Sequence, residues 1–396
     1  MKDNPDNYVS TVLDSASQLD AREWNALLDR QAQPSPFMRH EYLAALEHSA
    51  SATPATGWTP RFLTLMRGSE LQAACAMYLK DHSYGEYVFD WAWANAYAQH
   101  GLEYYPKGVI AVPFTPVPGT RLLAHDAAAR TALVRATLAW CRKRKLSSLH
   151  LLFGAHEDVA ACQSAGLMLR HAVQFHWINA AAEGRRYESF DDFLASLTQE
   201  KRKKIRQERR KVAEAGVTFR WSTGGAISAG DWNFFYRCYE RTYLEHGNAP
   251  YLTRDFFRRM AATMPQHWLL FVAEVRGKPI AASLIALSAP PGDASSPRVA
   301  YGRYWGALQR VDCLHFEACY YRPLQWCIEH GFDRFEGGAQ GEHKMARALM
   351  PVKTTSAHWL AHPAFADAVE KFLEREDRGI EHYLERLERR SPFRHG

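Results

Sequence analysis

Three side chains that can move a proton or hold an anion lie in one glycine-rich stretch, Phe335-Glu336-Gly337-Gly338-Ala339-Gln340-Gly341-Glu342-His343-Lys344. Glu336 is a candidate base or amine-orienting carboxylate, and His343 is the alternative base because histidine titrates near neutral pH. Lys344 is a candidate for binding a phosphate or an oxyanion. Each group also has an ordinary explanation: a turn-capping carboxylate, a polar loop histidine and a solvated lysine. Their density in one turn favours an enzyme over a binding protein.

The elements that must position this turn occur twice in the chain. Arg67-Gly68 divides two apolar runs in the first half, and Arg276-Gly277 divides two such runs in the second. Leu138-Ala139-Trp140-Cys141 is matched in the same way by Leu324-Gln325-Trp326-Cys327. A hairpin, a strand, a helix and another strand are therefore expected in each half. This repetition predicts two copies of one α/β unit.

Hydrophobic periodicity and turn residues predict the elements of both copies. In the first half we expect helical structure in 8–50, a hairpin in 62–79, an aromatic strand in 87–93, a proline-rich loop in 104–119, a helix in 127–145, and strands in 148–153 and 167–179. In the second half we expect one charged helix in 190–215, a strand in 217–221, helices from 231 and 253, a hairpin in 268–287, a strand–helix–strand crossover through 299–306, 314–330 and 332–338, and a last helix from 363. The expected domains are 8–180 and 187–375, followed by a tail in 376–396.

Composition fits a folded protein without a membrane span. The 396 residues are 47% hydrophobic and 23% charged, and no apolar run reaches the roughly 18 residues of a membrane helix. Residues 1–7 lack a signal-peptide pattern, so a cytoplasmic location is expected. The seven cysteines have no C-x-x-C spacing. Cys313, His315 and Cys319 are therefore interpreted as packed side chains, and we expect neither a disulfide nor a structural metal.

The net charge of +6 is concentrated in the basic segment 201–211. Lys201, Lys204, Arg206 and Arg210 are candidate ligands for an anion such as a tRNA backbone, a phospholipid surface or a nucleotide-linked acceptor. A solvated helix face explains the same charges. Aromatic residues do not interleave them, which argues against stacking on single-stranded nucleic acid.

Several longer motifs carry a family resemblance. In the first half they are Gly85-Glu86-Tyr87-Val88-Phe89-Asp90-Trp91-Ala92-Trp93-Ala94, Tyr104-Tyr105-Pro106-Lys107, Pro113-Phe114-Thr115-Pro116, Gly119-Thr120-Arg121-Leu122-Leu123 and Gln174-Phe175-His176-Trp177. In the second half they are the basic segment, Tyr301-Gly302-Arg303-Tyr304-Trp305-Gly306, His315-Phe316-Glu317-Ala318-Cys319-Tyr320-Tyr321, the glycine-rich turn and Ser356-Ala357-His358-Trp359. With these motifs the chain resembles the peptidoglycan biosynthesis/recognition proteins, a Fem-like branch of the GNAT acyltransferase superfamily.

The resemblance implies two tandem GNAT-like folds, with a long basic helix between them and a helix at the C-terminus, and it implies N-acylation. An alkyl amine is protonated at neutral pH, so acylation needs a base and an oxyanion donor. Reaction is expected where strands 299–306 and 332–338 splay apart. Arg303 and Trp305 share one face of the first strand, whereas His315 and Glu317 point to different sides of the helix; all four are candidates for substrate binding or packing. Glu86, Asp90, Tyr104, Tyr105, Lys107 and Arg121 are the candidates of the first half, with structural roles as the alternative.

The donor and acceptor are less defined than the fold. The loop 308–313 lacks the glycines of an acetyl-CoA pyrophosphate loop, and no G-x-S-x-G elbow is present, which disfavours simple acetyl-CoA chemistry and a covalent serine mechanism. We favour an acyl thioester such as acyl-CoA as co-substrate, with no tightly bound cofactor and with a lipid-like or cell-envelope amine as acceptor, as in bacterial ceramide synthases. The alternatives are transfer from aminoacyl-tRNA to a peptidoglycan-type amine, and a non-catalytic protein that binds an envelope precursor or RNA. A peripheral position at the inner membrane is compatible with the lipid acceptor. Where the family often has glycine, this chain has Ala348.

Overall fold

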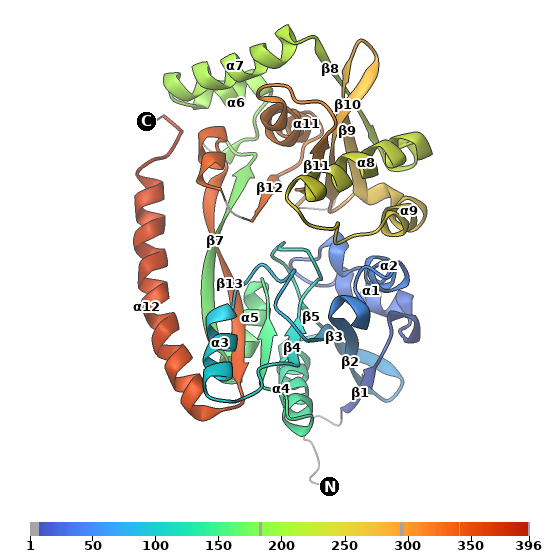
Figure 1. The fold of residues 1–396 in the computed structure, drawn as a ribbon, viewed down its shortest axis with the longest axis vertical. Coiled ribbons are helices and arrows are strands. Elements are labelled where there is room, and N and C mark those ends of the chain that lie inside the picture. Colours follow the sequence, from blue (N-terminus) through green and yellow to red (C-terminus); the bar gives the residue numbers. More distant parts are fainter. Residues whose placement is uncertain (1–7, 182–183, 294–296, 340, 395–396) are drawn as a thin grey trace. The chain divides into compact units, whose positions relative to one another are not determined.

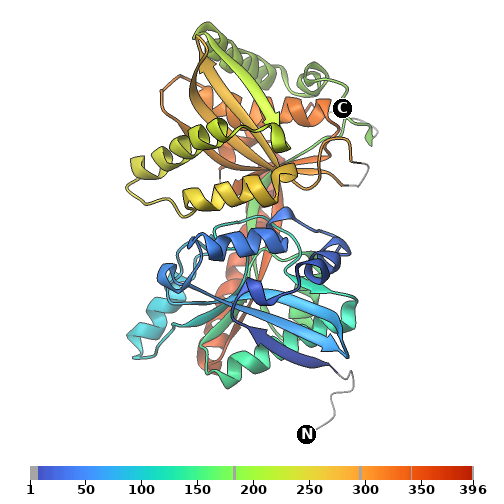
Figure 2. The same ribbon diagram turned by 90° about the vertical axis from the view of Figure 1, so that its right-hand side faces the viewer.

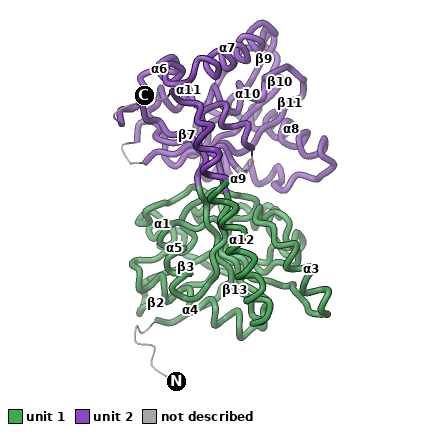
Figure 3. Tube along the Cα trace, turned by 90° about the vertical axis from the view of Figure 1, so that its left-hand side faces the viewer, with its two compact units in different colours: residues 1–172, 353–382 green, residues 173–352, 383–396 purple. Residues whose placement is uncertain are grey.

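A computed structural model describes residues 8–181, 184–293, 297–339 and 341–394. Residues 1–7, two residues of the expected linker (182 and 183) and Gln340 of the glycine-rich turn thus lie outside the described residues. The chain divides into two compact units: unit 1 comprises Met1–Ala172 and Lys353–His382, and unit 2 comprises Val173–Val352 and Tyr383–Gly396 (Figure 3). The unit boundaries therefore fall inside strands and a helix, and the C-terminal part of the chain contributes to both units.

Unit 1 is a mixed sheet covered by helices. Its elements are β1 (Val9–Leu13), α1 (Ala21–Asp29), α2 (His40–His48), β2 (Trp58–Arg67), β3 (Glu70–Lys80), α3 (Trp91–Gln99), β4 (Lys107–Ile110), β5 (Leu122–Ala124), α4 (Ala127–Lys143), β6 (Ser148–Leu151), α5 (His156–Ser164), the start of β7 (Met168–Ile178), most of β13 (Met350–Leu360) and most of α12 (Pro363–Glu388) (Figure 1). The strand order is β1-β2-β3-β4-β6-β13, with β5 paired to β3. Only β4 and β6 in this series are parallel.

Unit 2 repeats this plan with its own core. Its elements are the end of β7, α6 (Phe190–Ser196), α7 (Gln199–Glu214), β8 (Val217–Thr223), α8 (Ala229–Glu245), α9 (Arg254–Thr263), β9 (Trp268–Val275), β10 (Lys278–Leu287), β11 (Val299–Ala307), α10 (Leu314–Phe316), α11 (Arg322–Glu329) and β12 (Arg334–Ala339). The strand order is β7-β12-β11-β10-β9-β8, and the pair β11–β12 is parallel. Figure 2 shows α8 and α9, in olive and yellow, along one face of β9–β11.

The two units share the arrangement that the sequence repeat predicts. A hairpin (β2–β3 or β9–β10) is followed by a parallel pair of strands (β4 and β6, or β11 and β12). A helix lies between the two strands of each pair along the chain, α4 in unit 1 and α10–α11 in unit 2. The mixed α/β fold with two tandem GNAT-like units is thus confirmed.

Local expectations were wrong in three places within unit 1. The start of the segment expected to be helical is the strand β1, which pairs with β2 from Val9 to Leu13. The expected strand in 87–93 is instead a loop followed by α3, because Tyr87 has a left-handed φ of 62° and the Asp90 carbonyl accepts the first helical hydrogen bonds. The proline-rich segment contains β4, whose residues 107–110 lie between two prolines and pair with β3.

The long charged helix expected in 190–215 is also wrong, because it is two helices. Leu197 and Thr198 separate α6 from α7 and have extended backbone angles. Leu197 is fully buried and forms a bridge with Phe393, and the Thr198 amide donates to the Pro392 carbonyl. Contacts with the C-terminal segment therefore replace the helical hydrogen bonds that the local sequence favours.

The crossover helix expected in 314–330 contains a π-helical turn at Glu317–Tyr321. Pro323 lacks the amide hydrogen that would bond to the Cys319 carbonyl in a regular α-helix. The Arg322 amide donates to the Glu317 carbonyl, five residues earlier, which is the π-helical pattern. Pro323 thus changes the hydrogen-bond register of the turn that faces the splayed strands.

No helix among the described residues has both the length and the apolar character that crossing a membrane requires.

Gly306 allows α8 to pack directly on β11. A Cβ at this position would lie 1.8 Å from the Cys238 carbonyl oxygen, which belongs to the backbone of α8. We therefore expect Gly306→Ala to lower the free energy of unfolding by at least about 2 kcal/mol, because backbone must move to admit the methyl group. Urea denaturation measures this change. Gly225→Ala, where a Cβ meets nothing within 4 Å, is the control, and equal stability of the two variants would contradict the packing argument.

Candidate functional site

The splayed strands of unit 2 enclose a cavity. β11 and β12 pair in parallel at Val299–Arg334, Ala300–Phe335 and Tyr301–Glu336, and their pairing ends there. A cavity of about 110 Å³ lies beyond this point. Its lining residues are Ser283, Ile285, Gly302, Arg303, Tyr304, Trp305, His315, Cys319, Tyr320, Phe335 and Gly337.

A β-bulge aims Arg303 at this cavity. Gly302 pairs with Ile285 and Tyr304 pairs with Leu284, so Arg303 is the extra residue of β11. A regular strand sends alternate side chains to opposite faces, but here four consecutive residues, 302–305, line one cavity. The sequence expectation that Arg303 and Trp305 share a face is met through this bulge.

The charge of the cavity wall is small and positive. Desolvation, followed by the interaction with His343 and the positive charges of Arg347 and Lys344, lowers the pKa of His315 to about 4, although the residue is exposed. His315 is thus neutral at physiological pH, and it lies against the edges of Trp305 and Tyr320. Among the described residues that line the cavity, Arg303 carries a charge and none is acidic.

Tyr320 links this cavity to His343. The Tyr320 hydroxyl lies 3.5 Å from His343 Nε2, and desolvation with the charges of Arg347 and Lys344 lowers the pKa of His343. A neutral His343 is able to accept a proton that passes along the tyrosine hydroxyl. His343 also lines a second, larger cavity of about 490 Å³ in unit 2, together with Lys201, Glu342 and Arg390.

Glu336 lies on the other face of β12. Phe335 and Gly337 line the cavity, so strand alternation turns the intervening carboxylate away. Glu336 forms an ion pair with Arg334, whose Nε lies 3.0 Å from Glu336 Oε1. Glu336 Oε2 lies 3.9 Å from His176 Nε2. Burial, followed by the charges of Arg334 and Lys344, lowers the pKa of His176 to about 3, so this histidine is neutral. The arrangement suits a carboxylate that holds β12 in place.

β12 has a bulge of its own, between Glu336 and Ala339 where it pairs with β7, and Lys344 is buried against it. Its Nζ donates to the Gly338 carbonyl at 2.9 Å, and desolvation lowers its pKa to about 8. The turn that carries Lys344 ends at Ala348, which is buried and has a φ of 61°. This left-handed angle favours glycine, which explains why glycine suits this position in the family.

Another expected residue, Glu317, and one residue that was not expected, Arg347, have ionic partners within unit 2. Glu317 is buried and paired with Arg209 of α7 at 3.1 Å and with Arg322 at 2.7 Å. Arg347, which the sequence did not single out, is 3.0 Å from Glu208 of the same helix. Ion pairs therefore hold the inner face of the basic helix, whereas Lys204, Arg206 and Arg210 are exposed on α7.

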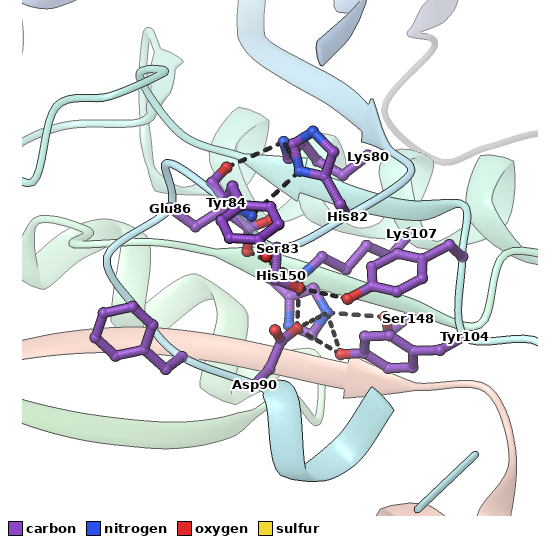
Figure 4. A network of polar contacts seen from close by, with 12 residues as sticks. Lys80, His82, Ser83, Tyr84, Glu86, Asp90, Tyr104, Lys107, Ser148 and His150 are labelled. Atoms are coloured by element: carbon purple, nitrogen blue, oxygen red, sulfur yellow. Dashed lines mark hydrogen bonds and ion pairs between the residues drawn. The ribbon is translucent and has the colours of Figure 1, made fainter. Parts of the chain in front are cut away.

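The candidate residues of the first half other than Arg121 meet in unit 1, where the buried Lys107 is their centre (Figure 4). Its Nζ donates to Glu86 Oε2 and to Ser83 Oγ, both at 2.8 Å, and to Asp90 Oδ2. The Tyr105 hydroxyl lies 2.9 Å from Ser83 Oγ. Burial raises the pKa of Glu86 to about 7. Burial also opposes ionisation of Asp90, but the charge of Lys107 outweighs it and holds the pKa of Asp90 well below its usual value.

A chain of polar side chains continues from this cluster. The Tyr104 hydroxyl donates to Asp90 Oδ2 at 2.7 Å and lies 3.2 Å from His150 Nε2. His150 Nδ1 lies 2.7 Å from His358 Nδ1. Burial lowers the pKa of both histidines, to about 3 for His150. His358 lies in one of the motifs that carry the family resemblance, but neither histidine was a candidate site residue, because the two meet only through strands more than 200 positions apart in the chain.

Arg121 does not join this cluster. It is buried, and its guanidinium donates to main-chain carbonyls, including that of Leu152 at 3.1 Å. These hydrogen bonds hold the loop before β5 in place. Lys80 lies near the cluster instead: its Nζ donates to the Tyr84 carbonyl at 3.2 Å and lies 3.9 Å above the Trp58 ring.

These features define the chain as a protein of two tandem GNAT folds, with a bulged, cavity-lining strand in its second unit. The chain belongs to the FemAB-like family, described as peptidoglycan biosynthesis/recognition, whose family model matches residues 15–395. Among curated proteins, none matches the sequence significantly.

Similar solved structures support the fold. FemX is 10% identical, with a TM-score of 0.53 over 91% of this chain and 100% of FemX. L-PGS from Bacillus licheniformis is 11% identical, with a TM-score of 0.52 over 89% of this chain and 97% of that chain. Identity this low transfers the fold and not the substrates.

Burial of Lys344 makes stability depend on pH. Its pKa in the folded chain, about 8, is below the ordinary lysine value of 10.5, so between these values the unfolded chain binds more protons and stability rises with pH. We expect the unfolding free energy of the wild type to rise relative to Lys344→Met by about 2 kcal/mol between pH 7.5 and 9.5. Urea denaturation at both pH values measures the difference. The exposed Lys203→Met is the control, and the same slope in both variants would contradict the assignment.

Proposed function

We propose that the chain is an N-acyltransferase that moves an acyl group from an acyl thioester, such as acyl-CoA, to a primary amine. The acceptor is a lipid-like or cell-envelope precursor, in keeping with the description of the family. The reacting carbonyl would occupy the cavity between β11 and β12. One observation carries this proposal: the cavity wall offers Arg303 and neutral or apolar groups, and no acidic residue is among its described lining.

The composition of this wall bears on the donor. An aminoacyl group carries an ammonium close to the reacting carbonyl and needs a carboxylate or several oxygens to replace its hydration. Ile285, Phe335 and the aromatic rings of Tyr304 and Trp305 instead suit a hydrocarbon chain. This supports an acyl thioester over an aminoacyl ester.

The residues of the cavity also suggest how transfer proceeds. The amine nitrogen attacks the thioester carbonyl, the new C–N bond forms, and the C–S bond breaks to release a thiolate. Arg303, which lines the cavity, would stabilise the negative charge that develops on the carbonyl oxygen. The proton lost by the amine passes through Tyr320 to the neutral His343, which is 3.5 Å away. Lys344 supports the β12 bulge through the Gly338 carbonyl and acts as a positioning residue.

Replacement of Arg303 tests this assignment. With hexadecanoyl-CoA and a primary amine, we expect an N-acyl amide by mass spectrometry, and we expect Arg303→Gln to lower kcat/KM by about 100-fold. The exposed Arg310→Gln in the loop after β11 is the matched control and should retain full activity. Equal activity of Arg303→Gln and Arg310→Gln would overturn the role given to Arg303.

The exposed basic face of α7 favours one alternative function, transfer from aminoacyl-tRNA. That function requires saturable tRNA binding. The triple variant Lys204→Ala, Arg206→Ala, Arg210→Ala should then bind tRNA more weakly and with less dependence on salt. For three phosphate contacts on single strands, the slope of log K against log[salt] should fall in magnitude by about 2. We expect the wild type to show no saturable tRNA binding at physiological salt in a filter-binding assay, because acidic side chains already pair with part of the exposed basic face, Asp191 with Arg206 and Asp312 with Lys211. Saturable binding combined with transfer from aminoacyl-tRNA alone would reverse the choice of donor.

We place the reaction in the cytoplasm, with peripheral contact to the inner membrane when the acceptor is a lipid. A non-catalytic binding protein remains the contrasting class. Formation of an amide product separates the two, because a binding protein would retain donor and amine without joining them.

A further inference from the structure

The buried cluster of unit 1 contains two carboxylate oxygens with no hydrogen-bond partner among the described residues. They are Glu86 Oε1 and Asp90 Oδ1. The side chains of Glu86 and Asp90 are only 1% and 3% exposed. A buried carboxylate oxygen without a donor is costly, and in native proteins such an atom calls for a water, an ion or a ligand.

The charges of the cluster point to a positive ligand. One ammonium, that of Lys107, donates hydrogen bonds to both carboxylates, at Glu86 Oε2 and Asp90 Oδ2. Lys80 adds little, because it donates to the Tyr84 carbonyl and desolvation lowers its pKa to about 7. Burial raises the pKa of Glu86 to about 7, and a further positive charge beside this carboxyl would favour its ionised form. His150 and His358 are neutral, so they supply no compensating charge.

Exposed aromatic side chains lie on or next to the same loop. Tyr84 is 60% exposed, Phe89 is 52% exposed and Trp91 is 36% exposed. The rings of Tyr84 and Trp91 are 4.9 Å apart. The loop of residues 81–90, which carries Glu86 and Asp90, contains no helix or strand, and a ligand reaches the two oxygens only if this loop shifts. An apolar rim beside buried carboxylates complements a molecule with an alkyl part and a cationic end.

We propose that unit 1 binds a primary alkylammonium, whose nitrogen donates to Glu86 Oε1 and Asp90 Oδ1 and whose alkyl chain lies on Tyr84, Phe89 and Trp91. This inference goes beyond the acyl transfer proposed for unit 2. Binding of the amine requires no acyl donor and no residue of the unit 2 cavity. Failure of transfer and failure of amine binding are therefore separate results.

The direction of proton exchange on binding distinguishes a cationic ligand from an anionic one at this site. An ammonium beside Glu86 lowers the pKa of that carboxyl and of Lys80, so both groups release protons when the cation binds. A carboxylate or phosphate ligand would raise both pKa values and cause proton uptake. Calorimetry at pH 7 in two buffers of different ionisation enthalpy reports the number and direction of protons exchanged.

The experiment uses the full chain with octylammonium, ethanolammonium and octanoate as probes. We expect octylammonium to bind with proton release, ethanolammonium to bind at least tenfold more weakly because it lacks the chain, and octanoate not to bind. Glu86→Gln should weaken octylammonium at least tenfold, because it removes the charge while keeping the shape. The exposed Glu103→Gln, from the segment before β4, is the matched control and should bind as the wild type does.

A second variant keeps the test decisive if Glu86→Gln does not fold. Trp91→Ala removes part of the exposed rim and should weaken octylammonium by about tenfold while leaving ethanolammonium binding unchanged. Absence of octylammonium binding to the wild type, equal binding of octanoate, or proton uptake on binding would each overturn the proposal. Loss of acyl transfer in Arg303→Gln with octylammonium binding intact would leave the unit 1 site standing.

Discussion

The buried ion pair between Glu208 and Arg347 holds the functional side of unit 2 together. Glu208 belongs to α7, and both of its oxygens lie 3.0 Å from the Arg347 guanidinium. The Tyr321 hydroxyl, from the π-helical turn, also donates to Glu208. Arg347 donates to the His343 carbonyl at 2.8 Å and stacks 3.5 Å above the Phe316 ring. One pair thus joins the basic helix, the crossover helix and the glycine-rich turn. Removal of either partner would leave an uncompensated buried charge, which costs about 3–5 kcal/mol.

The same fold supports different chemistry in the two units. In unit 2 the bulge at Arg303 opens a small cavity whose wall is neutral or positive. In unit 1 the pair β4–β6 carries Lys107 and His150, and the neighbouring loop brings Glu86 and Asp90 against them. Both units have the hairpin and the parallel pair, while the polar side chains on this frame differ. Because fold does not fix function, each unit has to be understood from its own residues.

Much of the frame could be predicted from the sequence, because it depends on local signals. The Arg-Gly turns mark both hairpins, and α4 has the apolar spacing of Val134, Leu138 and Cys141. The features that build the sites depend on contacts distant in the chain. Nothing local indicates the extra residue at Arg303, and His358 reaches His150 only because β13 pairs with β6. The end of α6 at Leu197 likewise reflects burial against the C-terminal segment and not its own sequence.

The positive charge of Arg303 bears both on which acyl donor binds in the cavity and on how the transition state would be stabilised. Two positive charges about 5 Å apart repel by about 3 kcal/mol at an effective dielectric constant of 20. An aminoacyl ammonium held beside Arg303 would therefore lose roughly two orders of magnitude in affinity. In the proposed reaction, the oxyanion that forms when an amine attacks a thioester would gain an attraction of the same size from the same guanidinium. A neutral acyl chain avoids the penalty in the ground state and keeps the benefit in the transition state, which is the difference that accelerates a reaction.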